Sequence, residues 1–311
     1  MPQQPRCEVI PLPGHQVSFR VDGGEVTRWH YGSEYPRPFF FPFNGPSGET
    51  LTRMGHPGAS NHDHHRSVWF AHHKVLGINF WGDGNDAFIR QKMWFEYRDG
   101  EEECAMAVQL DWHDGHDPQP LLEQEVIATL RPLEDGEWTL DLQSTFRPKS
   151  AELEFEQSNF GFLAVRVAKS LSGHFGEGTI TGASGEVGEK NLFGIENRWM
   201  DYSGPILTVD AQGETVSVTN GITYFDHPAN PNFPAKWHVR EDGWMGASAC
   251  RDSALLTTRL EPLRLRYLLH VHESGINPQR AEELFTAWKQ RPMQTVQKGS
   301  KPHMQFEIAE L

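Results

Sequence analysis

The feature that most limits what this chain can fold into is a series of short segments in which apolar and polar residues alternate. Glycine-containing turns join these segments. Three such turns are Asp22-Gly23-Gly24, Asp99-Gly100 and Glu134-Asp135-Gly136. Alternation of apolar and polar residues has the two-residue period of a strand, and turns of this kind join strands into hairpins. The sequence therefore predicts hairpins over residues 15–31, 94–110 and 122–146. Two further strands are expected on either side of Asn220-Gly221.

One segment has the pattern of a helix. Asn277 is a suitable N-cap, and Pro278 follows at the first helical position. The apolar residues then recur with the spacing of one buried helical stripe, at Ala281, Leu284, Phe285 and Trp288. Arg291-Pro292 is expected to end this helix.

The composition supports the same fold class. The 311 residues include 29 Gly and 21 Pro, which suits many short strands joined by turns. Ten Trp and 19 Phe can form a large aromatic core. We therefore predict an all-β fold, a large antiparallel β-sandwich with one C-terminal helix, in a single domain over residues 1–311.

Charge and hydropathy disfavour several classes of partner. The net charge of −14, with no dense cluster of Lys and Arg, disfavours nucleic acid and anionic membranes. The sequence contains no run of about 18 apolar residues, the length needed to span a bilayer. The first residues lack the apolar stretch of a signal peptide. The three cysteines, Cys7, Cys104 and Cys250, are far apart and form no disulfide or zinc pattern. A cytoplasmic location is expected, and the sequence does not indicate the oligomeric state.

Sequence motifs of several enzyme classes are missing. The chain has no Gly-x-Gly-x-x-Gly, no phosphate-binding P-loop, no Gly-x-Ser-x-Gly and no His-Glu-x-x-His. Nucleotide-binding, P-loop and serine-hydrolase functions therefore lose most of their support.

Residues 56–73 form the first concentration of polar residues, with six of the 16 histidines. If this segment is extended, His62 and His64 point to one face, where they could chelate a divalent metal with a third ligand from elsewhere. Imidazoles also suit proton transfer near neutral pH. Arg66 could bind a carboxylate, a phosphate or a sugar hydroxyl.

Two more concentrations lie in the second half of the chain. Asp226 could orient His227 or serve only to cap backbone amides, while Trp237 and His238 could line a pocket. In the strand near residue 270, one face carries Arg264, Arg266, His270 and His272. Basic groups of this kind are hard to bury without partners, so this face is expected to line solvent or a polar cavity.

Motifs along nearly the whole chain resemble a bacterial family labelled PmoA-like, whose function is unassigned. The matching motifs are Arg37-Pro38-Phe39-Phe40, residues 61–70, Gly77-Ile78-Asn79-Phe80-Trp81, residues 161–166, Asp201-Tyr202-Ser203-Gly204, Phe225-Asp226-His227-Pro228, Trp237-His238-Val239-Arg240 and residues 265–272. The methane-oxygenase part of that label does not suit a chain without apolar spans. The resemblance implies a fold similar to the galactose-mutarotase-like supersandwich and a role in bacterial sugar catabolism.

These observations favour an enzyme that acts on a small sugar or sugar derivative by acid–base chemistry. The expected catalytic residues are His64, His65, Asp226 and His238, with His65 or His238 as the acid and Asp226 as the base. The expected substrate-binding residues are Arg66, Trp81, Arg166, His227, Trp237, Arg240 and His272. One alternative is a metal-dependent hydrolase or lyase in which His62 and His64, joined by His238 or His272, bind the ion. A second alternative is a non-catalytic sugar-binding module.

Overall fold

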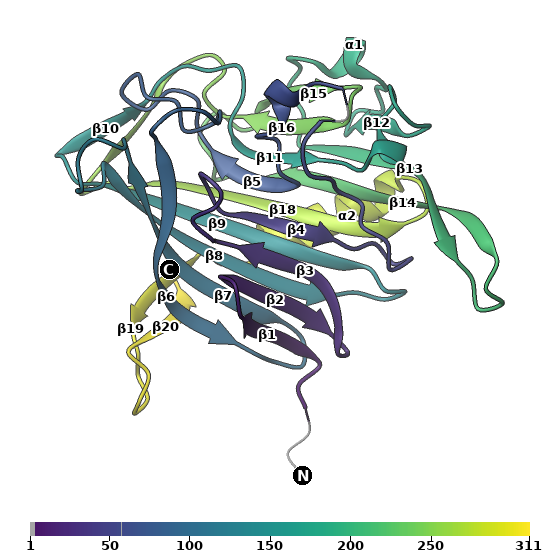
Figure 1. The fold of residues 1–311 in the computed structure, drawn as a ribbon, viewed down its shortest axis with the longest axis horizontal. Coiled ribbons are helices and arrows are strands. Elements are labelled where there is room, and N and C mark those ends of the chain that lie inside the picture. Colours follow the sequence, from purple (N-terminus) through teal and green to yellow (C-terminus); the bar gives the residue numbers. More distant parts are fainter. Residues whose placement is uncertain (1–3, 57) are drawn as a thin grey trace.

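Two large antiparallel sheets face one another in a computed structural model that describes residues 4–56 and 58–311 (Figure 1). In spatial order, the first sheet contains β1 (Cys7–Leu12), β2 (Gln16–Val21), β3 (Gly24–His30), β4 (Phe39–Phe43), β5 (Val68–Ala71), β11 (Phe162–Arg166), β16 (Trp244–Ser248) and β15 (Lys236–Arg240). The second sheet contains β12 (Thr179–Gly182), β13 (Trp199–Val209), β14 (Thr215–Asp226), β18 (Leu263–Glu273), β9 (Trp138–Pro148), β8 (Leu122–Pro132), β7 (Cys104–His113) and β6 (Phe88–Arg98).

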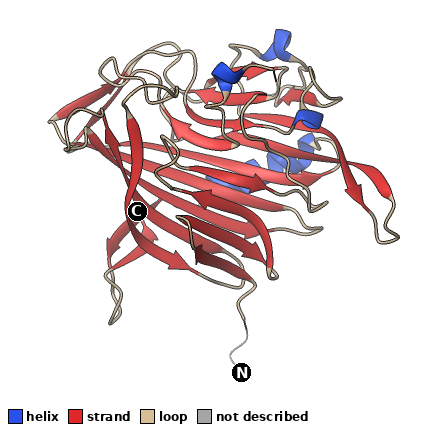
Figure 2. Cartoon of the chain, in the orientation of Figure 1, coloured by secondary structure: helices blue, strands red, loops and turns tan. Residues whose placement is uncertain are grey.

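Small elements complete the fold (Figure 2). Two further strand pairs are β10 (Glu152–Phe155) with β17 (Leu255–Thr258), and β19 (Gln294–Lys298) with β20 (Phe306–Glu310). Within the described residues, helix is limited to α1 (Glu189–Leu192), α2 (Pro278–Lys289) and two 3-10 turns, Ser60–His62 and Lys169–Leu171. The predicted all-β, antiparallel sandwich with a C-terminal helix is confirmed. No helix in this part of the chain is long and apolar enough to cross a membrane.

Apolar side chains from both sheets meet in the space between them. Phe70 of the first sheet lies against Phe146 and Tyr267 of the second, and Trp237 packs edge-on against Tyr224. Burial of aromatic groups of this size is the main favourable contribution to folding. These contacts also identify which face of each strand looks inward.

Helix α2 covers the outer face of the second sheet. Asn277 caps it by accepting a hydrogen bond from the Arg280 N–H at 3.2 Å, as the sequence predicts. Phe285 and Trp288 of its apolar stripe pack on Phe225 and Leu268. The part of the outer face formed by Phe225 and Leu268 is therefore buried beneath the helix.

The predicted hairpins at the three glycine turns are present, but the expected break at Asn220-Gly221 is wrong. Strand β14 runs through both residues without a turn. Gly221 pairs with His272 of β18, and a Cβ atom on Gly221 would lie 2.5 Å from the Cε1 atom of His272. The glycine is therefore required by a close side-chain approach across the sheet rather than by a turn.

Candidate functional site

Strand register places the candidate residues on the outer face of the first sheet. Paired positions share a face, and one such row crosses four neighbouring strands: Trp69 of β5, Ala164 of β11, Gly246 of β16 and His238 of β15. The next row of pairs is Arg166, Trp244 and Arg240. Phe70 and Trp237 point into the core between the sheets, so their neighbours Trp69 and His238 point outward.

The loop over residues 58–66 lies on this outer face and brings histidines onto it. The segment is not extended, because the Asp63 N–H donates to Ser60 O and the His65 N–H donates to His62 O. These turn bonds bring the His64 and His65 rings to 4.4 Å between centroids. The prediction that His62 and His64 share one face of an extended segment is therefore wrong.

Imidazole and indole rings then form one continuous group, which we call the histidine cluster. Its members are His62, His64, His65, Trp69, Trp81, Phe160, His238 and Trp244. Trp244 connects its two halves, with its ring centroid 5.1 Å from His65 and 4.2 Å from His238. His65 belongs to the loop and His238 to β15, and the Trp244 side chain of β16 contacts both rings.

Burial keeps the imidazoles of His64, His65 and His238 uncharged at neutral pH. It lowers the pKa of His64 to about 4, with a further contribution from the nearby Arg37 guanidinium. It also lowers the pKa of His65 far below its ordinary value, and His64 and Arg166 act in the same direction. The pKa of His238 falls to about 4, again mainly because of burial. The cluster therefore presents neutral rings that can accept protons.

Hydrogen bonding defines the tautomer of His238. Its Nδ1 atom lies 3.1 Å from the backbone oxygen of Asn159, and a carbonyl oxygen can only accept. Nδ1 therefore carries the hydrogen in the neutral ring, and Nε2 carries a lone pair. No other hydrogen bond of this ring occurs within residues 4–56 and 58–311. Nε2 of His238 is thus available to accept a proton.

A second group of charges centres on Asp242, in the turn between β15 and β16. Its carboxylate accepts from Arg166 Nη1 at 2.7 Å and from His56 Nε2 at 3.1 Å, and Arg53 Nη2 donates to its backbone oxygen at 2.6 Å. Burial would raise the pKa of Asp242, but the Arg166 guanidinium outweighs burial and lowers the pKa. Asp242 therefore stays ionised and positions both arginines.

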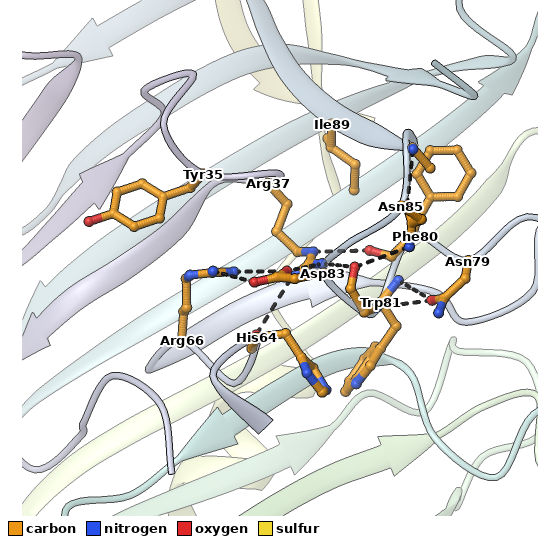
Figure 3. Close-up of polar contacts among 12 residues, drawn as sticks. Tyr35, Arg37, His64, Arg66, Asn79, Phe80, Trp81, Asp83, Asn85 and Ile89 are labelled. Atoms are coloured by element: carbon orange, nitrogen blue, oxygen red, sulfur yellow. Dashed lines mark hydrogen bonds and ion pairs between the residues drawn. The ribbon is translucent and has the colours of Figure 1, made fainter. Parts of the chain in front are cut away.

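A third group, around Asp83, holds the loops that carry His64 and Trp81. The buried Arg37 donates to Asp83 at 2.9 Å, to Phe80 O at 3.0 Å and to Gly82 O at 2.7 Å. Arg66 also bonds Asp83, so two guanidinium groups approach this carboxylate from different sides (Figure 3). Arg37 thus has a positioning role, and Arg66 already has a carboxylate partner.

Several buried side-chain nitrogens around the cluster lack a hydrogen-bond partner among the described residues. They are Trp69 Nε1, Trp244 Nε1, His65 Nδ1, and two nitrogens each of Arg53 and Arg166. Buried polar groups are normally hydrogen-bonded, because an unpaired one costs about 1–3 kcal/mol. Their concentration on one face of one sheet is the strongest mark of a binding site in this structure.

Some predicted site residues lie elsewhere. Trp237 is fully buried between the sheets, and its Nε1 donates to Asn197 O at 2.8 Å. Asp226 accepts from Asn230 Nδ2 at 2.7 Å and from the Ala235 N–H at 2.9 Å, so it braces its own loop. Burial raises the pKa of Asp226 to about 7. The predictions that Trp237 lines the site and that Asp226 is its base are corrected accordingly.

His227 and His272 belong to the second sheet instead. His227 packs edge-on against Trp288 of α2 at 4.7 Å, and His272 Nε2 lies 2.7 Å from Asp201. His270 is bonded to Glu137 at 3.0 Å. His270 and His272 are buried and bonded to carboxylates, so the expectation that they line solvent or a polar cavity is wrong.

The remaining predicted residues are divided between the cluster and its margin. The cluster contains His64, His65, Trp81 and His238, and Arg166 adjoins it through Trp244. Arg240 lies at the margin, where it bonds Glu189 at 2.6 Å and stacks on Phe193. No group of three or more His, Cys, Asp or Glu side chains is arranged to hold a metal ion within the described part of the chain. His62 and His64 consequently lack the third ligand that the metal hypothesis requires.

Sequence reasoning missed Asp242, Trp244 and Arg53. Asp242 lies in Glu241-Asp242-Gly243, which has the composition of an ordinary hairpin turn. Trp244 begins the next strand, where an aromatic residue is expected in any case. The one available signal was the motif Trp237-His238-Val239-Arg240 just before this turn. Because the second strand of a hairpin lies beside the first, residues after the turn are expected to lie near this motif.

A surface hollow outside the cluster lacks unpaired groups of this kind. It has a volume of about 830 Å³ and is lined by Arg6, Asp22, residues 132–138 and Arg280, among others. None of its lining residues has a buried side-chain nitrogen or oxygen without a partner among the described residues, and Arg6 bonds Asp22 at 3.1 Å while Glu137 bonds His270 at 3.0 Å. We therefore prefer the histidine cluster as the candidate site.

Comparison with known proteins gives a family without a function. The model of a family of unknown function, DUF6807, matches residues 16–286. No curated protein sequence matches the chain. Among solved structures, the 4-alpha-glucanotransferase from Thermococcus litoralis is similar over 88% of this chain, with 10% identity and a TM-score of 0.26. The chain spans 40% of that structure's length, and a likeness this weak supports no conclusion.

Proposed function

The chain belongs to DUF6807, a family of unknown function, and we propose that it is an enzyme of sugar metabolism that transfers a proton on a small sugar-like substrate. The histidine cluster is its active site in this proposal. The PmoA-like and mutarotase-like resemblances of the sequence are part of the same proposal.

The observation that carries the proposal is the unprotonated Nε2 of His238 on the face that also carries Arg166. A base must offer a lone pair, and this ring does so because Asn159 O holds the hydrogen on Nδ1. In the proposed step, Nε2 of His238 accepts a proton from a hydroxyl or an acidic C–H of the sugar. Indole N–H groups of Trp69 and Trp244 and the Arg166 guanidinium then stabilise the oxygen that becomes negative.

Aromatic side chains of the cluster suit a sugar as the substrate. Indole and phenyl rings pack on the apolar C–H face of a sugar, while nearby polar groups bind its hydroxyls. Phe160 and Trp81 lie 4.9 Å apart between centroids, and Phe160 is half-buried beside His238. These rings are proposed to orient the substrate over the base.

Replacement of His238 by Asn tests the proposed base. An Asn side chain can still donate to Asn159 O, but it has no basic nitrogen at the position of Nε2. We expect turnover to fall by about 10²–10⁴-fold. Nuclear magnetic resonance of aldoses, ketoses and uronic acids in deuterated water would detect anomeric exchange, deuterium incorporation or new products.

His227→Asn is the matched control, because His227 and His238 are both 6% exposed and both have a pKa of about 4. This variant should retain turnover, since His227 lies on the other sheet. Full turnover by His238→Asn would refute the assignment of the base. Binding of sugars without any turnover would favour a non-catalytic binding module, and loss of turnover on chelation would favour the metal-dependent alternative.

A further inference from the structure

Arg53 and Arg166 form an unusual pair beside the histidine cluster. Arg166 is fully buried, and its one side-chain hydrogen bond runs from Nη1 to Asp242 at 2.7 Å. Arg53 is half-buried and donates from Nη2 to the backbone oxygen of Asp242 at 2.6 Å. Nε and Nη2 of Arg166, and Nε and Nη1 of Arg53, have no acceptor within residues 4–56 and 58–311.

The charge around this pair is also unbalanced. Two guanidinium groups share one carboxylate, that of Asp242. His56 accepts a hydrogen bond from the Gly58 N–H on Nδ1 and donates one to Asp242 from Nε2. A ring that accepts on one nitrogen and donates from the other is neutral, so His56 adds no charge. His65 also lies near Arg166, and burial together with this arginine lowers the pKa of His65. Burial and the neighbouring Arg166 together lower the pKa of Arg53 to about 10. One positive charge therefore remains without a partner.

Neighbouring residues add donors rather than acceptors. Trp244 pairs with Arg166 in the strand register, and its indole N–H has no acceptor. The indole N–H of Trp69 is unpaired as well. An indole N–H can only donate, so a ligand that satisfies this region must bring several acceptor atoms. An oxyanion supplies such acceptors and also neutralises the surplus charge.

We propose that Arg53 and Arg166 bind the oxyanion of an acidic sugar, either a carboxylate or a phosphate. The sugar part of this inference rests on the proposed function, but the anion site rests only on the two arginines. Arg66 and Arg240 are not assigned this role, since Asp83 and Glu189 already occupy their guanidinium groups. Selectivity for acidic over neutral sugars follows from the same donors.

A titration with simple anions tests the site without any sugar. Acetate and inorganic phosphate are added separately to ¹⁵N-labelled protein, and the arginine Nε–H and tryptophan indole N–H signals are recorded. We expect saturable shifts of the Arg166, Arg53 and Trp244 signals, and their loss in Arg53→Gln. Arg198→Gln is the matched control, because Arg198 is paired with Glu282 beside the second sheet. Absence of saturable shifts, or equal shifts in Arg53→Gln, would overturn the inference and leave water as the partner of these donors.

A second experiment compares galacturonate, galactose 6-phosphate and galactose by calorimetry on the full chain. Acidic sugars should bind about tenfold more tightly than galactose, the difference expected for one charge-assisted interaction. Tighter binding of galacturonate identifies a carboxylate ligand, and tighter binding of galactose 6-phosphate identifies a phosphate ligand. Equal binding of all three would refute the anion site and keep the sugar function. Anion shifts without binding of any sugar would instead refute the sugar function.

Discussion

Both sheets carry arginines and histidines on their outer faces, but their surroundings differ. On the second sheet three buried basic groups of β18 each have a carboxylate: Arg266 bonds Asp141 at 2.6 Å, His270 bonds Glu137 at 3.0 Å, and His272 bonds Asp201 at 2.7 Å. On the first sheet, the histidine cluster and the Arg53–Arg166 pair retain unpaired donors. Paired buried charges are adequately explained by the fold, whereas unpaired ones require a ligand or water.

Protonation differs between the two faces as well. Burial alone would lower the pKa of His272, but the attraction of Asp201 outweighs burial and raises the pKa. No carboxylate raises the pKa of His65 in this way. Burial, His64 and Arg166 lower it. His272 is therefore favoured in its protonated form and His65 in its neutral form, whereas burial lowers the pKa of His270 beside His272.

Removal of a carboxylate from the second sheet should have the largest effect. Asp141→Ala leaves the Arg266 guanidinium, only 2% exposed, without its carboxylate. We expect the free energy of unfolding to fall by about 3–5 kcal/mol. Urea unfolding followed by tryptophan fluorescence measures the change. A loss below about 1 kcal/mol would show that the pairing on this face is not structural.

Gly221→Ala should have the next largest effect. The added Cβ would lie 2.6 Å from Ser203 Oγ and 2.7 Å from His272 Nε2, so the imidazole must move away from Asp201. A cost of about 1–3 kcal/mol is expected in urea unfolding. Gly275→Ala is the control, because a Cβ there meets no atom within 4 Å. Equal stability of the two variants would contradict the close approach of His272.

A change of pH should affect His64 and His238 of the first sheet and His272 of the second in opposite directions. His64 and His238 have pKa values of about 4 in the folded chain, below the ordinary 6.5, so protonation of the unfolded chain lowers stability as the pH falls from 6.5 to 4. His272 has a raised pKa, so its contribution is complete below pH 6.5 and is lost as the pH rises through the folded value. The changes from His64 and His238 should each be on the order of 1 kcal/mol after allowance for solvent screening.

Histidine ring signals in nuclear magnetic resonance, together with urea unfolding at each pH, measure these changes. His238→Asn should remove part of the acid limb and leave the His272 titration in place. A midpoint for His238 near 6.5 would mean that its ring is solvated, and the contrast with His272 would disappear.

The smallest effect is expected for an exposed ion pair beside the second sheet. Arg198 and Glu282 are 46% and 39% exposed, unlike the pairs beneath α2. Arg198→Gln should change the free energy of unfolding by less than about 1 kcal/mol. Equal losses in Arg198→Gln and Asp141→Ala would show that burial does not distinguish the pairs, contrary to the comparison of the two faces.

Local patterns in the sequence determined much of the fold. The alternation of apolar and polar residues, together with the turn residues, predicted the hairpins. The Asn277 cap and the apolar residues at helical spacing predicted α2. Both kinds of feature depend on residues close in sequence. Alternation also predicted that His270 and His272 share a face opposite Tyr267. It failed at Asn220-Gly221, where the reason for a glycine is a side chain of another strand.

Tertiary structure alone decided which polar residues meet. The sequence pointed to the histidines of residues 56–73 and to His238, but Trp244 joins them only because β15 and β16 return side by side. Asp201 and Glu137 bond the β18 histidines from positions far away in the chain. Whether a basic group has a partner depends on such distant neighbours and on burial, which no local pattern contains. That physical property, rather than residue type, distinguishes the candidate site from the structural face.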